Sequence, residues 1–169
     1  RDTDRSRGLG DVYKRQGLRY AEMLNIKLRV RNLVRKYDTS NPYELARHLK
    51  IDVYEFKLPR DVRGFIIRPL RRKMIFLNDS LSETEKIVAL SHELGHVRLH
   101  SGYGYTLKAN TPYYRSSRRE AEANEFAAHL LSYRHDINAD MLQQVLNQKR
   151  PEPLLVHKML NEIINSQEM

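Results

Sequence analysis

Apolar residues recur at helical spacing in the first part of the chain. Between residues 19 and 36 they alternate loosely with many Arg and Lys side chains, which predicts a surface helix. Asn41 then precedes Pro42, and Glu44 stands at the third position of the next helical pattern, which runs to about residue 49. A capping Asn followed by Pro predicts a short helix there. The residues expected to pack inward are Leu45, Ala46 and Leu49.

Three short apolar segments follow and have the pattern of strands. Residues 51–56 alternate between apolar and polar side chains, as in a half-buried strand. Residues 64–67 and 74–77 are mostly apolar and are joined by a short basic turn. Together they predict a small antiparallel sheet of three strands.

The next pattern predicts a helix that runs from residue 83 to about residue 100. Ser82 and Glu85 have the spacing of a capping box, in which each side chain bonds the backbone N–H of the other residue. The apolar residues then follow in steps of three and four, which is typical of a helix with one buried face. They are Ile87, Leu90, Leu94 and Val97.

The second half of the chain is less regular. Residues 101–118 contain four Tyr, two Gly and one Pro without clear periodicity, which indicates a long loop. Another helix is expected over residues 119–131. Two weaker helical patterns follow, at residues 139–148 and 154–165. We therefore expect one α+β domain over residues 17–169, mainly helical, in which residues 132–169 form a less clearly indicated helical tail.

Composition supports a folded domain and restricts its chemistry. The 169 residues are 40% apolar and 30% charged, with a formal net charge of +9. No stretch approaches the roughly 20 apolar residues of a membrane span, and no signal-peptide core precedes the domain, so we expect a cytoplasmic protein. The absence of Cys excludes disulfides, thiolate nucleophiles and Cys-ligated metals. Any metal must therefore be held by His, Asp or Glu.

The first residues are expected to lie outside the domain. The chain does not begin with Met, and the peptide DVYKRQ at residues 11–16 resembles the translation of a transposon end that is used in sequencing adapters. Residues 1–16 are therefore expected to be adapter-derived, or else a disordered arm. They carry five basic and three acidic residues, so a net charge of +7 remains in the rest of the chain.

The sequence HELGH at residues 92–96 matches the H-E-x-x-H motif and falls within a predicted helix. Two His four positions apart lie about 6 Å apart along a helix and about 40° apart around it, so both can reach one metal ion. Zinc suits imidazole ligands in the absence of thiolates. Glu93 is about 100° around the helix from His92, a position that suits a base taking a proton from the attacking water.

A hydrolytic zinc site needs a third protein ligand. His100 is a poor candidate because an unbroken helix would place it about 12 Å from His92, so a helix-terminal or supporting role is expected. The helix expected over residues 119–131 offers three alternative ligands, and spacing alone does not choose between them. They are Glu120, Glu122 and Glu125.

HELGH at residues 92–96, followed by EAEANEFAAHLL at residues 120–131, resembles the ImmA/IrrE family of metallopeptidases. The second signature of that family reads roughly E-x-E-A-N-x-F-A-A-x-L-L. The resemblance implies a zincin-like fold and a gluzincin-like site. In such a site His92 and His96 bind Zn²⁺, Glu93 is the general base, and a Glu of the helix expected over residues 119–131 is the third ligand. Matched by position, that Glu is Glu122. After residue 131 the Pro that is frequent in the family is missing.

The same resemblance implies a zinc-dependent endopeptidase that cleaves a DNA-binding transcriptional repressor of a mobile element or phage-like region. The alternatives are a general peptidase and a regulatory module that binds a repressor or DNA without proteolysis. An intact Glu93 argues against the module, since a non-catalytic protein does not need the base. Candidate donors to the developing oxyanion are Tyr103, Tyr105, Tyr113, Tyr114 and His100.

Overall fold

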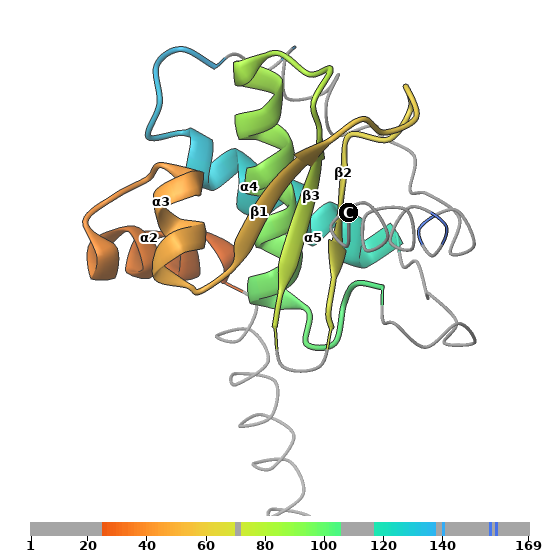
Figure 1. The fold of residues 1–169 in the computed structure, drawn as a ribbon. Helices are drawn as coiled ribbons and strands as arrows, with labels where there is room; N and C mark the ends of the chain where they lie inside the picture. Colours follow the sequence, from red (N-terminus) through yellow and green to blue (C-terminus); the bar gives the residue numbers. More distant parts are fainter. Residues whose placement is uncertain are drawn as a thin grey trace, which may run out of the picture.

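The computed structural model describes residues 25–69, 72–105 and 117–137, together with residues 140, 156 and 158. In Figure 1, α4 lies behind the three strands, α5 crosses behind α4, and α2 and α3 lie to one side. The elements are α2 (Ile26–Tyr37), α3 (Pro42–His48), β1 (Asp52–Phe56), β2 (Gly64–Ile67), β3 (Met74–Asn78), α4 (Glu83–Leu99) and α5 (Ser117–Leu131). The expected arm at residues 1–16 and the two expected tail helices fall outside the described residues, apart from three single positions.

Side-chain caps determine where the helices begin, as the sequence predicts. The Asn41 side chain accepts a hydrogen bond from the Tyr43 backbone N–H at 3.0 Å, with Pro42 as the first residue of α3. At the start of α4, Ser82 Oγ accepts from the Glu85 N–H, and Glu85 Oε2 accepts from the Ser82 N–H. These bonds satisfy N–H groups that lack a partner within the helix.

The sheet is mixed, so the prediction of an antiparallel sheet is wrong for one of its strand pairs. β3 lies in the centre, antiparallel to β2 and parallel to β1. The hairpin turn makes β2 and β3 neighbours, and the outer edge of β2 is bonded by Tyr105, whose N–H donates to Ile66 O at 2.8 Å. β1 pairs instead with the other edge of β3, and the connection between β1 and β2 crosses the end of the sheet.

Each face of the sheet carries a hydrophobic core. Ile66, Ile75 and Leu77 point toward the helices and belong to the larger cluster. Phe65 and Phe76 point to the opposite face, where their rings stack with centroids 5.5 Å apart. This alternation follows from the two-residue period of a strand. Because both faces of β3 are covered, it reads as a continuous apolar run.

Gly95 allows α4 and α5 to approach closely. A Cβ atom at this position would lie 3.0 Å from the carbonyl oxygen of Ala123 and 3.1 Å from Phe126 Cβ. Ala123 and Ala127 are fully buried on the facing side of α5. This contact fixes how α5 is placed against the HELGH segment of α4.

We expect Gly95→Val to destabilise the protein, because the added methyl groups would meet the backbone of α5. Overpacking of this kind costs about 1–3 kcal/mol. Thermal or urea unfolding measures the change. Arg98→Val, at an exposed position of the same helix, is the matched control and should change the free energy of unfolding by no more than about 0.5 kcal/mol. Equal stability of both variants would contradict the close contact.

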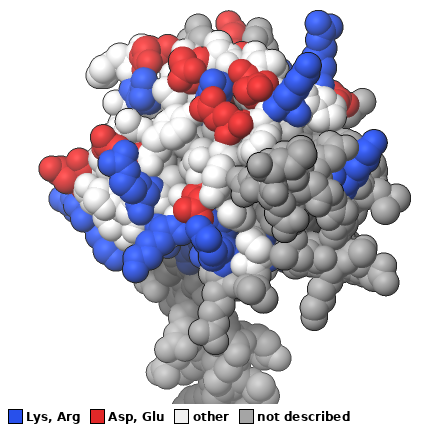
Figure 2. Space-filling view, viewed as in Figure 1, with Lys and Arg blue, Asp and Glu red and all other residues white. Residues whose placement is uncertain are grey.

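The surface of the described region is strongly charged. Figure 2 shows Lys and Arg side chains gathered over α2 and α3 on the face that it displays. α2 itself has five basic residues and no acidic one: Lys27, Arg29, Arg31, Arg35 and Lys36. Among the described helices, none has both the length and the apolar character that a membrane span requires.

Candidate metal centre

α4 carries the HELGH segment through the middle of the molecule, between the sheet and α5. The side chains of His92, Glu93 and His96 are at most 1% exposed. The Nε2 atoms of the two His are 3.1 Å apart, so both rings point to the same place. The expected convergence of two imidazoles separated by four residues is therefore present in the fold.

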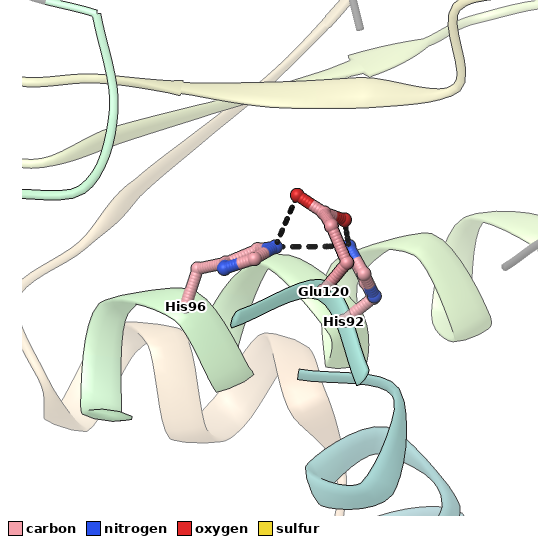
Figure 3. A group of neighbouring side chains, drawn as sticks. All are labelled: His92, His96 and Glu120. Atoms are coloured by element: carbon pink, nitrogen blue, oxygen red, sulfur yellow. Dashed lines mark hydrogen bonds and ion pairs between the residues drawn. The ribbon is translucent and has the colours of Figure 1, made fainter. Parts of the chain in front are cut away.

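A carboxylate of α5 completes this group. Glu120 Oε2 lies 3.3 Å from His92 Nε2, and Glu120 Oε1 lies 3.5 Å from His96 Nε2. Figure 3 shows the carboxylate reaching across from α5 to the two rings on α4. These three residues form the only group with metal-ligand spacing found among the described residues.

The spacing of the three residues fits a small tetrahedral ion. With metal–ligand bonds of about 2.0–2.1 Å, the ligand atoms of a tetrahedral site are about 3.3 Å apart. The observed separations of 3.1, 3.3 and 3.5 Å are close to that value. Two imidazoles and one carboxylate also form a typical donor set of a catalytic zinc site, which keeps one position open for water. The residues therefore suit a divalent metal of the zinc type.

Glu122, which family resemblance indicated as the third ligand, lies elsewhere. Its Oε2 is 2.9 Å from His100 Nε2, and its Oε1 accepts a hydrogen bond from Arg118 Nε at 2.8 Å. Residues two apart on a helix point about 160° away from each other, so only one of Glu120 and Glu122 can face the two His. The structure brings Glu120 to them.

A signal for Glu120 was present in the sequence. Glu120 is three residues before Ala123 and seven before Ala127, small residues of the kind that let two helices pack closely. On a helical wheel it lies about 20° from Ala127, whereas Glu122 lies about 140° away. The stripe that packs against α4 therefore ends in Glu120 at the level of the two His.

His100 caps the C-terminus of α4 and supports the site from behind. Its Nδ1 lies 3.0 Å from His96 Nδ1. Burial lowers the pKa of His100, although the hydrogen bond and charge of Glu122 act in the opposite direction. Burial acts to raise the pKa of Glu122, but its hydrogen bonds to His100 and Arg118 outweigh this and lower it. At neutral pH, a neutral His100 therefore faces a charged Glu122.

Tyr103 contacts two members of the metal-ligand group. Its ring stacks on His96, with centroids 3.7 Å apart and planes within 4°, and its hydroxyl donates to Glu120 Oε1 at 2.5 Å. The side chain is 3% exposed, and Arg68 Nε donates to its backbone carbonyl. Tyr103 was expected only as one of several oxyanion donors, and its contacts with Glu120 and His96 were not anticipated.

We expect Tyr103→Phe to weaken metal binding by about 10-fold, because loss of a hydrogen bond that orients a ligand typically costs 10–100-fold in affinity. The ring that stacks on His96 is retained, so the melting temperature should change little. Zinc affinity is measured by competition with a chromophoric chelator. An unchanged affinity would show that the hydroxyl does not orient Glu120.

The other His and Tyr residues lie away from the metal-ligand group or outside the described residues. His48 stacks on Tyr37, and His129 Nε2 lies 3.5 Å from Glu125 Oε1. Tyr105 is buried in the cluster on the outer face of the sheet. His157, Tyr113 and Tyr114 fall outside the described residues.

Glu93 lies where β2 meets α4. A Cβ atom at Gly64, the first residue of β2, would lie 3.7 Å from Glu93 Cγ and 2.9 Å from the Phe76 carbonyl oxygen. Gly64 therefore lets β2 pass close to β3 and to the carboxylate side chain. Glu93 is not a member of the group of described residues at metal-ligand spacing, which consists of His92, His96 and Glu120.

Comparison with known proteins identifies a family for this chain. The model of the Peptidase_M78 family, the IrrE N-terminal-like domain, matches residues 46–151, which include α4 and α5. The chain belongs to this family. The M78 match covers all three residues of the metal-ligand group and also Glu93. Membership of a metallopeptidase family implies a metal-dependent hydrolase that acts on a protein substrate.

A relative from a bacteriophage is also found. The uncharacterized immunity region protein 2 of Bacillus phage phi105 is 40% identical over 112 residues, which cover 63% of this M78 chain and 67% of that protein. No solved structure gives a significant match. The ImmA/IrrE resemblance inferred from the two signatures is thereby confirmed.

Proposed function

We propose that this M78 protein is a zinc-dependent endopeptidase whose ligands are His92, His96 and Glu120. The observation that carries the proposal is the convergence of two imidazoles and one carboxylate at 3.1–3.5 Å in a chain that belongs to a peptidase family. Glu120 replaces Glu122 as the proposed third ligand because its carboxylate lies beside both rings. Burial of the two His keeps their orientation fixed.

The role proposed for each residue follows from the position of its side chain. When bound, zinc supplies the positive charge that acidifies water and polarises the peptide carbonyl. Glu93 takes a proton from the attacking water and delivers it to the leaving amine. Because Glu93 is fully buried, its carboxylate acts in surroundings from which bulk water is largely excluded. Tyr103 holds Glu120, so it is a poor candidate for the oxyanion donor.

We propose that the substrate is a DNA-binding repressor of a mobile element or phage-like region. Three points support this. The phage relative is named for an immunity region, and the family resemblance implies repressor cleavage. The basic face of α2 suits a partner with an acidic surface. The alternative is a module that acts on a repressor or DNA by binding alone.

The test is proteolysis of the repressor encoded nearest the gene. We expect the zinc-loaded protein to cleave it at one or a few bonds, which mass spectrometry of new termini identifies. Removal of zinc with a chelator should stop cleavage, and re-addition of zinc should restore it. Binding of the repressor without new termini, in the presence of bound zinc, would favour the non-proteolytic alternative. A peptide library run in parallel distinguishes a general peptidase, which would cut many unrelated sequences.

A further inference from the structure

Behind the metal-ligand group, a chain of hydrogen bonds runs from His96 to the surface of α5. His96 Nδ1 lies 3.0 Å from His100 Nδ1, and His100 Nε2 lies 2.9 Å from Glu122 Oε2. The second oxygen of Glu122 accepts from Arg118 Nε at 2.8 Å. His96 and His100 are buried, and the Glu122 side chain is 17% exposed.

With both imidazoles neutral, only one placement of their protons leaves Nε2 of His96 free to bind a metal and keeps every hydrogen bond of this chain. If Nε2 of His96 binds a metal, its lone pair is used there, and the proton of the neutral ring must be on Nδ1. Nδ1–H then donates to Nδ1 of His100, which must carry its own proton on Nε2. That proton is donated to Glu122, a carboxylate that can only accept. Every donor in the chain thus has an acceptor.

We propose that His100, held by Glu122, is a positioning residue that fixes the tautomer and ring orientation of His96 for metal binding. The inference rests on the proposed metal site. It also gives Glu122 a role that differs from that of a ligand, since its negative charge acts on the metal through two imidazoles. Outer partners of this kind orient a ligating His and raise its basicity.

Three variants separate the links of this chain. His100→Phe keeps a ring of similar size but removes the acceptor for His96. His100→Asn restores an acceptor, because Asn Oδ1 and His Nδ1 occupy equivalent positions on Cγ. Glu122→Gln keeps an acceptor for His100 but removes the charge. Glu125→Gln is the matched control, on the same helix and with its carboxylate half exposed.

Two measurements test the proposal: zinc affinity by chelator competition, and the protonation of His96 by long-range ¹H–¹⁵N correlation of the imidazole rings. We expect His96 to be protonated at Nδ1 in the wild type. We expect His100→Phe to weaken zinc binding about 10–100-fold and His100→Asn to recover most of that loss. Glu122→Gln should weaken binding less than His100→Phe, and Glu125→Gln should have no effect.

The outcomes distinguish this proposal from the proposed function. If the wild type binds zinc and a folded His100→Phe binds it equally well, the positioning role is wrong and the metal site stands. If His100→Asn binds as weakly as His100→Phe, the hydrogen bond is not the cause. If His100→Phe fails to fold, the other measurements decide. The proposal is overturned if Glu122→Gln binds zinc as tightly as the wild type and His96 of the wild type is protonated at Nε2. A wild type that binds no zinc contradicts both.

Discussion

Replacement of Glu120 by Ala is expected to abolish tight zinc binding, whereas Glu122→Ala should still bind about one ion per chain. The reason is geometric, since Glu120 lies 3.3 and 3.5 Å from the two Nε2 atoms and Glu122 bonds His100 and Arg118 instead. Loss of a direct ligand should cost more than the 10–100-fold typical of an outer partner. Elemental analysis and chelator competition measure both effects.

Glu125→Ala is the control for this comparison, because it removes a carboxylate from the same helix at a half-exposed position. It should bind zinc like the wild type. The opposite result, tight binding by Glu120→Ala and none by Glu122→Ala, would restore the assignment made by matching the family signature.

The second large effect is expected from Glu93→Gln. The amide has nearly the same shape as the carboxylate but cannot take a proton, so cleavage should fall by about 10²–10⁴-fold. Zinc content should stay at the wild-type level because Glu93 is not one of the three proposed ligands. Because Glu93 is fully buried, the neutral amide should also be tolerated in the fold.

Two readouts are needed for Glu93→Gln. Appearance of new termini in the repressor reports cleavage, and derepression in cells reports regulation. Loss of both with zinc retained supports proteolysis as the mechanism. Full regulation by a variant that no longer cleaves would instead show that the protein acts by binding.

Local features of this fold were predictable from sequence because they depend on neighbouring residues. The capping box of Ser82 and Glu85 and the Asn41–Pro42 pair place the starts of α4 and α3 correctly. Strand order was not predictable in the same way. It depends on pairings between segments that are distant in sequence, such as the parallel pairing of β1 with β3 and the bridge of Tyr105 to the outer edge of β2.

In the candidate site, too, the features set within one helix were predictable from sequence, and those set by the packing of two helices were not. The HELGH motif predicts the placement of His92 and His96 because their spacing within one helix fixes it. The third residue of the group depends on how α5 is rotated and placed against α4, which the Gly95–Ala123 contact determines. Matching by signature gave Glu122, whereas the packing stripe of Ala123 and Ala127 points to Glu120.

A zinc-loaded crystal tests whether His92, His96 and Glu120 together hold a zinc ion. An anomalous difference map collected at the zinc edge should show one strong peak at about 2.0–2.1 Å from both Nε2 atoms and from a carboxylate oxygen of Glu120. Glu122 should remain bonded to His100. The absence of a peak there, or a peak bound by Glu122 in place of Glu120, would show that the proposed set of ligands is wrong.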